Sequence, residues 1–163
     1  MPFTLLHFGP LLLIGLIFFS VFNLSAVLLP NILIDLEPLT LYSVNYFFGT
    51  TFLEHNFFHS FLGATFIALI TAFLVIKFFG FFNNLQGKFK LKQKQDNKLI
   101  VFSSFFGAFT HILFDSIQCN QMNTFLPLPG NPLCVPGSWQ FFALGFTALL
   151  LISLFLIILK KKK

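Results

Sequence analysis

The feature that most constrains this chain is a set of three long apolar runs, at residues 57–79, 99–117 and 141–159. Each run is close to the length of about 20 residues that an α-helix needs to cross the hydrocarbon core of a bilayer. Charged residues make up only 9% of the 163 residues, whereas soluble domains average about 25%. The sequence therefore predicts an all-α integral membrane protein.

Turn and capping residues divide the chain into about five helices within a single domain, residues 1–163. We expect a short N-terminal helical hairpin, a polar and aromatic connector, and then three spanning helices. Asn23 and Ser25 suggest the turn of the hairpin, Pro30 should kink its second arm, and Pro38 should end that arm because proline lacks a backbone donor. The expected helices cover residues 4–22, 26–36, 54–79, 99–118 and 139–159, with the connector at 38–51.

Lysine placement predicts the orientation in the membrane. The chain has no Arg, and its ten Lys lie in residues 77–98 and in the C-terminal run 160–163. Lysine-rich loops and tails mark the cytoplasmic side, so we expect a multi-pass protein of the cell inner membrane with residues 80–98 and the C-terminus in the cytoplasm. The Pro- and Gly-rich loop 120–138 should lie on the opposite face. Plain solvated charge would give the same placement, and the composition does not indicate nucleic-acid binding.

All the acids and histidines except Asp96, which lies in the lysine-rich loop, should gather at the end of the bundle away from the lysines. Ionisable groups at membrane depth are costly and are usually functional or paired. No lysine is near them in sequence, so a divalent cation would supply the missing counter-charge. Two pairs stand four residues apart on a helix and thus share one helix face. The expected metal ligands are His7, Asp35, His55, His59, His111 and Asp115.

Each of these residues also has a simpler explanation. His7 could be an interfacial polar residue, Glu54 a helix-capping acid, and Glu37 a solvated side chain or a neighbour of the ligands. Asp115 could simply hydrogen-bond to His111. Structural polar contacts between helices are the general alternative to a metal site. The convergence of these residues on one side favours a metal, and imidazole with carboxylate suits Zn²⁺ best, with Mn²⁺ or another first-row ion as alternatives.

Several stretches resemble a known family. "MPFTLLHFGP", "NILIDLEPL", "HNFFHSFLGA", "FTHILFDS" and "GNPL" occur in an order similar to that of the membrane-bound, metal-dependent hydrolases named for LexA-regulated members of the inner membrane. That resemblance implies a helical membrane protein with hydrolase activity. The ligand order more weakly resembles zinc-dependent phospholipases C. Those enzymes carry a later His-x-x-x-Glu, and after Asp115 this chain has neither histidine nor acid.

The sequence thus indicates a membrane-embedded hydrolase with one or two divalent ions. Asp35 or Glu37 would act as general base toward a metal-bound water. The expected substrate is amphiphilic, such as a phospholipid or a lipid-linked phosphodiester, and membrane lipid is the expected partner. The alternative is a non-catalytic metal-binding or transport-related protein. Cys119 and Cys134 could form a disulfide or remain two free thiols.

Overall fold

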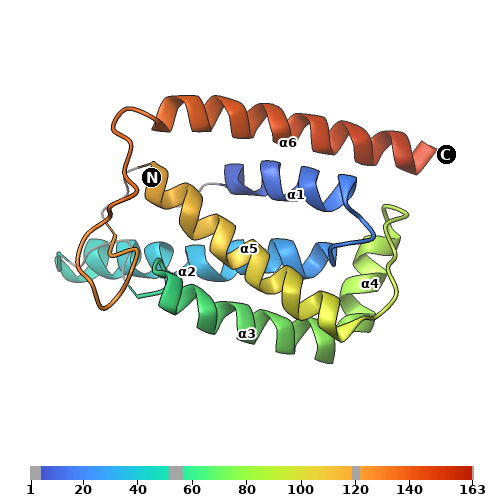
Figure 1. Cartoon of the computed structure of the whole chain (residues 1–163), viewed down its shortest axis with the longest axis horizontal. Helices are drawn as coiled ribbons and strands as arrows, with labels where there is room; N and C mark the ends of the chain where they lie inside the picture. The colour runs from blue at the N-terminus through green and yellow to red at the C-terminus, as the bar shows by residue number, and fades with distance from the viewer. Residues whose placement is uncertain (1–4, 52–56, 119–121, 163) are drawn as a thin grey trace.

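The computed structural model describes residues 5–51, 57–118 and 122–162, and the regular secondary structure of this part is entirely helical, without strands (Figure 1). The predicted all-α class is confirmed, with six α-helices in the described part where about five were expected. A 3₁₀ turn, η1, precedes them. The bounds are η1 Leu5–His7, α1 Phe8–Ile17, α2 Leu24–Phe48, α3 Phe61–Lys77, α4 Phe79–Gly87, α5 Asn97–Ile117 and α6 Trp139–Lys162.

Local capping explains where three of the helices begin. The Asn23 side chain accepts a hydrogen bond from the Ala26 backbone at the start of α2. Ser60 accepts from the Gly63 backbone at the start of α3. Asp96 accepts from the Leu99 backbone at the start of α5. Each contact satisfies a backbone donor that has no partner within the helix.

The expected end of the N-terminal hairpin at Pro38 is wrong. Helix α2 runs through both Pro30 and Pro38 and ends at Gly49, whose φ of 64° is left-handed. A single missing donor can be tolerated in a packed apolar helix, whereas a left-handed glycine ends the helix by turning its backbone. The 38–51 connector is therefore mostly helix.

Two further boundaries differ from expectation. Helix α3 begins at Phe61 rather than near residue 54, and residues 52–56 lie outside the described part of the chain. The expected loop at 80–98 begins instead with the short helix α4, which is bent by 78° from α3. The lysine-rich part of this segment is thereby confined to the residues after α4.

Helices α2 and α5 run in the same direction and contact each other in a regular register. The Asn23 backbone donates to the Ser103 hydroxyl, and the Asn31 side chain contacts His111, each pair being 80 positions apart. Between them, Gly107 lies against the backbone of Val27, and any added Cβ would collide there. One turn beyond Asn31 and His111, the same register places Asp35 beside Asp115. This pair of helices is the frame of the polar cluster.

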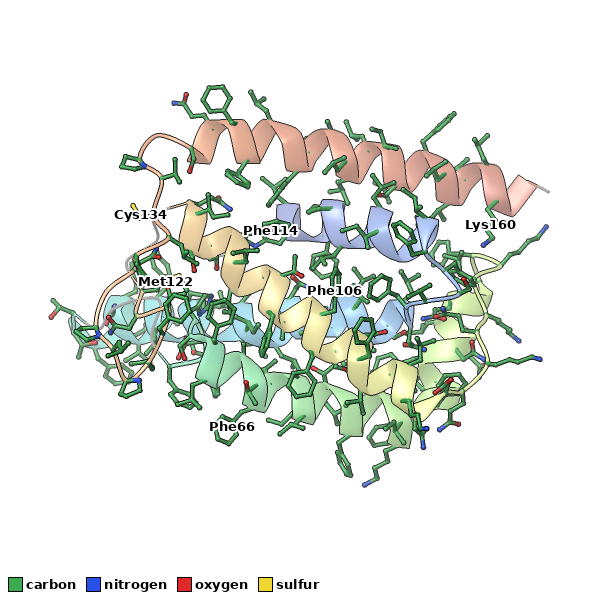
Figure 2. The ribbon with its side chains drawn as sticks, viewed as in Figure 1. Phe66, Phe106, Phe114, Met122, Cys134 and Lys160 are labelled. Carbon is green, nitrogen blue, oxygen red and sulfur yellow. The ribbon has the colours of Figure 1, made fainter. Side chains whose placement is uncertain are left out.

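Helix α6 packs mainly on α1 and leaves most of its other side chains exposed (Figure 2). The close approach of α1 to α6 requires Gly9, since a Cβ there would meet the α6 backbone at Phe146 and Leu150. Three segments, Leu24–Phe48, Asn97–Ile117 and Gln140–Lys160, are long and apolar enough to cross a membrane, and the bent pair α3 and α4 makes a fourth when counted as one span. These features support the prediction of a membrane protein.

Candidate metal centre

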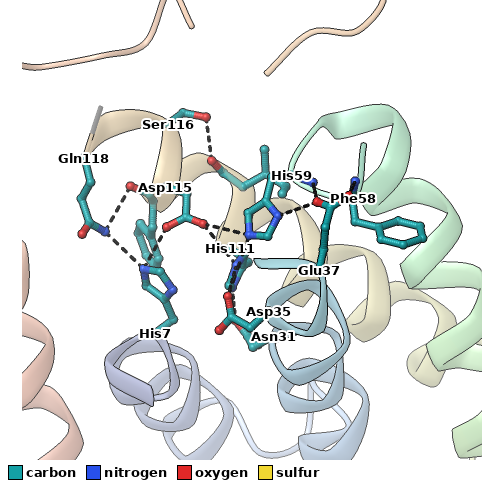
Figure 3. Close-up of polar contacts among 12 residues, drawn as sticks. His7, Asn31, Asp35, Glu37, Phe58, His59, His111, Asp115, Ser116 and Gln118 are labelled. Carbon is teal, nitrogen blue, oxygen red and sulfur yellow. Dashed lines mark hydrogen bonds and ion pairs between the residues drawn. The ribbon is translucent and has the colours of Figure 1, made fainter. Parts of the chain in front are cut away.

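The buried polar cluster draws side chains from four parts of the chain (Figure 3). His7 comes from η1, Asp35 from α2, His59 from the turn before α3, and His111 with Asp115 from α5. The two α5 residues are four apart and so lie one above the other on the face turned to α2. All five are buried, with at most 6% of any residue exposed.

Asn31 fixes the orientation of the His111 ring. The Asn31 amide nitrogen donates to the carbonyl oxygens of Val27 and Leu28 at 3.1 and 3.2 Å. Its amide oxygen therefore faces His111 Nδ1, at 3.0 Å. An amide oxygen is only an acceptor, so His111 Nδ1 carries the proton. In the neutral ring, Nε2 then presents its lone pair.

Glu37 has the same relation to His59. Its Oε2 lies 2.9 Å from His59 Nδ1 and accepts the His59 backbone N–H at 3.2 Å. Its Oε1 accepts the Phe58 backbone N–H at 3.1 Å. A carboxylate in this position assigns the Nδ1 proton and leaves Nε2 to face the cluster. A histidine held at Nδ1 by a carboxylate or carbonyl is typical of metal ligands.

The two Nε2 atoms converge on a pair of carboxylates. His111 Nε2 lies 3.4 Å from Asp35 Oδ1 and 3.3 Å from Asp115 Oδ2. His59 Nε2 lies 3.8 Å and 3.5 Å from the same two atoms. His111 Nε2 is buried and has no hydrogen-bond partner among the described residues. A lone pair facing carboxylate oxygens is repulsive unless a cation, either a proton or a metal ion, lies between them.

His7 approaches the other side of Asp115. Its Nε2 lies 3.5 Å from Asp115 Oδ1 and 3.2 Å from the amide nitrogen of Gln118. Burial lowers the pKa of His7 to about 4, although the Asp115 carboxylate acts in the opposite direction. The ring is therefore neutral at physiological pH, which is the form that binds metal ions. Asp115 stands between His7 and the two other imidazoles.

Two overlapping groups of three residues could hold a metal ion. They are His7 with His111 and Asp115, and Asp35 with His59 and His111, and the ligand atoms within each group lie within 4.8 Å of one another. Comparison with known protein families, with curated proteins and with solved structures finds no match. The assignment of a metal centre therefore depends on this chain's own geometry, and the family resemblance stays a prediction.

The structure brings together most of the residues expected from sequence. His7, Asp35, His59, His111 and Asp115 lie in one cluster of two overlapping groups, and Glu37 contacts His59 Nδ1. The sixth expected ligand, His55, falls outside the described residues, as does Glu54.

Sequence reasoning missed Asn31 and Gln118. Asn31 could have been found, because it stands four residues before Asp35 just as His111 stands four before Asp115. The contact of Gln118 with His7 joins residues 111 positions apart, and local spacing gives no sign of it.

Proposed function

We propose that this protein is a membrane-embedded metal-dependent hydrolase. The observation that carries the proposal is the arrangement of His59 and His111, each held at Nδ1 by an acceptor and each presenting Nε2 to the carboxylates of Asp35 and Asp115. Three or four mixed imidazole and carboxylate ligands suit Zn²⁺ or another first-row divalent ion, and no thiolate of the described residues joins them.

The ligands divide unequally between two positions. Asp35, His59, His111 and Asp115 Oδ2 would hold one ion. The other oxygen of Asp115 faces His7, so Asp115 could bridge to a second ion there. We therefore propose one firmly held ion and a second that depends on His7.

A metal at this point would lower the pKa of a bound water and polarise the substrate's scissile bond. The residues of the chain then have separate tasks. Asp35 would accept the proton of the attacking water. Glu37 would orient His59 rather than serve as base, because both its oxygens already accept hydrogen bonds from His59 and Phe58.

An amphiphilic substrate remains the preferred class because the cluster lies where the apolar helices α1 and α3 begin and α5 ends. The loop between α5 and α6 contains a pocket, which is lined by Phe125, Leu128 and residues 129–132. In its wall, the Asn131 amide donates to the Ser116 carbonyl at 2.8 Å, next to Asp115. This pocket is the proposed approach for a polar headgroup with its phosphoester.

One observation favours the alternative of a non-catalytic metal-binding protein, namely the burial of all five ligand side chains. A catalytic metal must keep a position open to water or substrate. Turnover therefore has to be tested separately from metal binding.

The test uses full-length protein purified in mild detergent. We expect about one or two Zn²⁺ or Mn²⁺ ions per chain by mass spectrometry and little after His111→Ala. A chromogenic phosphodiester should be hydrolysed, with loss of at least about 100-fold on chelation or in His111→Ala. Asp96→Asn, which alters an acid at the opposite end of α5 from Asp115, is the matched control. Metal without turnover would support the non-catalytic alternative, and a metal content near zero after reloading would refute both.

A further inference from the structure

The end of the molecule opposite the metal centre carries nearly all its positive charge. All ten Lys lie in residues 77–98 and 160–163, and Asp96 is the one acid among them. The Asp96 carboxylate is used to cap α5. Lys160 lies at this same end, with Nζ 4.2 Å from the centre of the Phe19 ring (Figure 2). In the described residues, every ion pair involves histidine and none involves lysine.

The segment after α4 carries four of these lysines and is anchored at two positions between them. Leu91 is buried against Leu12 and Leu24. Two positions on, the Gln93 side chain donates to the carbonyls of Phe19 and Phe22 at 3.0 and 2.7 Å. Gln93 also accepts the Leu24 backbone N–H at 2.9 Å. The segment is therefore pinned to the turn between α1 and α2.

Lysines alternate with these anchoring side chains along the chain. Lys88, Lys90, Lys92 and Lys94 are all exposed, and we call these four residues the lysine row. The stem of Lys92 also packs on Gly87, since a Cβ on that glycine would meet the Lys92 side chain at 2.6 Å. Residues 88–90 form a turn after α4, with Lys90 in the left-handed region at a φ of 58°. Beyond that turn, Leu91 and Gln93 are held against the rest of the molecule and leave Lys92 and Lys94 exposed.

Helix α4 places an apolar surface next to the lysine row. It is bent by 78° from α3, where the apolar span ends. Phe79 and Phe82 pack inward, while Phe78, Phe81 and Leu85 are 49%, 62% and 41% exposed. Those three residues are spaced by three and four and share one face of the helix. A short helix lying across the end of a span, apolar on its outer face and flanked by lysines, has the character of an interfacial helix.

We propose that the lysine row and α4 together bind the headgroups of anionic phospholipids. Ammonium groups donate to the headgroup phosphates, while the exposed face of α4 lies among the upper acyl chains. The exposed apolar residues decide between a lipid and a soluble polyanion, because only a lipid would cover them. The pinned backbone distinguishes this surface from the C-terminal lysines, residues 160–163, which have the same charge but of which Lys160 to Lys162 form the last turn of α6.

The experiment uses the full chain in nanodiscs with spin-labelled phosphatidylglycerol or phosphatidylcholine. Electron paramagnetic resonance measures the motionally restricted fraction of each lipid. We expect a preference for phosphatidylglycerol that weakens with salt. The preference should be at least about fivefold smaller in the variant that has Gln at positions Lys88, Lys90, Lys92 and Lys94. A fivefold change is about the effect of a single lysine near an anionic membrane surface.

The matched control changes the four tail lysines, residues 160–163, to Gln and thus removes the same charge. It should retain most of the preference, and Phe81→Gln should reduce it while the charge is unchanged. If the lysine-row variant and the tail variant lost the preference for phosphatidylglycerol equally, the lipid would be attracted only by the overall positive charge. That result would overturn the proposal. A wild type without preference for phosphatidylglycerol would also overturn it, as would a Phe81→Gln variant that is indistinguishable from wild type.

Discussion

At the residue scale, the candidate centre depends on side chains that are not ligands themselves. Asn31 holds His111, and Glu37 holds His59, each through Nδ1. The effect of such contacts is to fix the tautomer before any ion binds, so that less ordering is needed on binding. These residues should therefore influence metal affinity without contacting the metal.

Asn31→Ala removes the acceptor for His111 Nδ1 and allows the ring to change tautomer. We expect Zn²⁺ affinity to fall by about 10- to 100-fold, measured by competition with a fluorescent chelator. Asn84→Ala, at an exposed position on α4, is the control and should leave affinity unchanged. An unaltered affinity in Asn31→Ala would mean that the contact with His111 does not select the tautomer.

Metal binding should also compete with protons. Burial on its own lowers the pKa of His59, but the neighbouring carboxylates of Asp35 and Glu37, together with Asp115, outweigh it and raise the pKa above its ordinary value. The raised pKa favours the protonated ring in the metal-free protein, and an entering ion must displace that proton. Zn²⁺ affinity should keep rising with pH beyond the range in which an ordinary histidine loses its proton, and titrations in buffers of different ionisation enthalpy should show proton release. A pH-independent affinity would contradict this.

At the element scale, the sequence predicted the starts of α2 and α5 close to their capping residues, but it placed the start of α3 near residue 54 rather than at Phe61, after the Ser60 cap. It failed where local rules and packing disagree. Pro38 was expected to stop α2, yet the helix continues to Gly49, because the packing of α2 on α5 and α3 outweighs one lost hydrogen bond. The bend between α3 and α4 was missed because no proline stands at or next to Phe78, and the apolar sequence continues on both sides of it.

The α2–α5 contact at Gly107 can be tested directly. In Gly107→Ala, the new Cβ would meet the backbone of Val27, and a backbone cannot move aside as a side chain can. We expect a loss of about 1–3 kcal/mol in the free energy of unfolding, together with weaker metal binding because His111 and Asp35 move apart. Unfolding in mixed detergent micelles measures the first effect. Gly145→Ala, with open space around it, should be nearly neutral.

At the scale of the whole molecule, the site could be predicted as a set of residues but not as a geometry. The segregation of acids and histidines from lysines is visible in the sequence, and the hairpin brings His7 back beside Asp115 as expected. The distances depend on the parallel register of α2 and α5, which joins residues 80 positions apart. No local pattern specifies such a register.

Because the ligands come from four separate segments, a bound ion should stabilise the whole fold. An ion present at 100 times its dissociation constant adds about 2.7 kcal/mol if it binds only the folded state. We expect the melting temperature to rise with added Zn²⁺ and to fall with a chelator, by differential scanning fluorimetry in detergent. Asp115→Asn should remove this dependence. If the melting temperature of the wild type did not depend on metal, protons alone would lie between the imidazole and carboxylate groups of the cluster, and no metal ion would be bound.

The orientation of the molecule in the membrane gives the last prediction. The lysine row and the loop at residues 122–138 lie at opposite ends of the bundle (Figure 1), so they should face opposite sides of the membrane, the lysines facing the cytoplasm.

Cys134 is disulfide-bonded, and Cys119 lies outside the described residues. In a background with both cysteines changed to Ser, Leu128→Cys should react with a membrane-impermeant thiol reagent in intact cells, since Leu128 is 67% exposed. Lys90→Cys should react only after permeabilisation. The native cysteines should react in intact cells only after reduction. Labelling of Lys90→Cys in intact cells, with Leu128→Cys protected, would invert the orientation and place the metal centre on the cytoplasmic side.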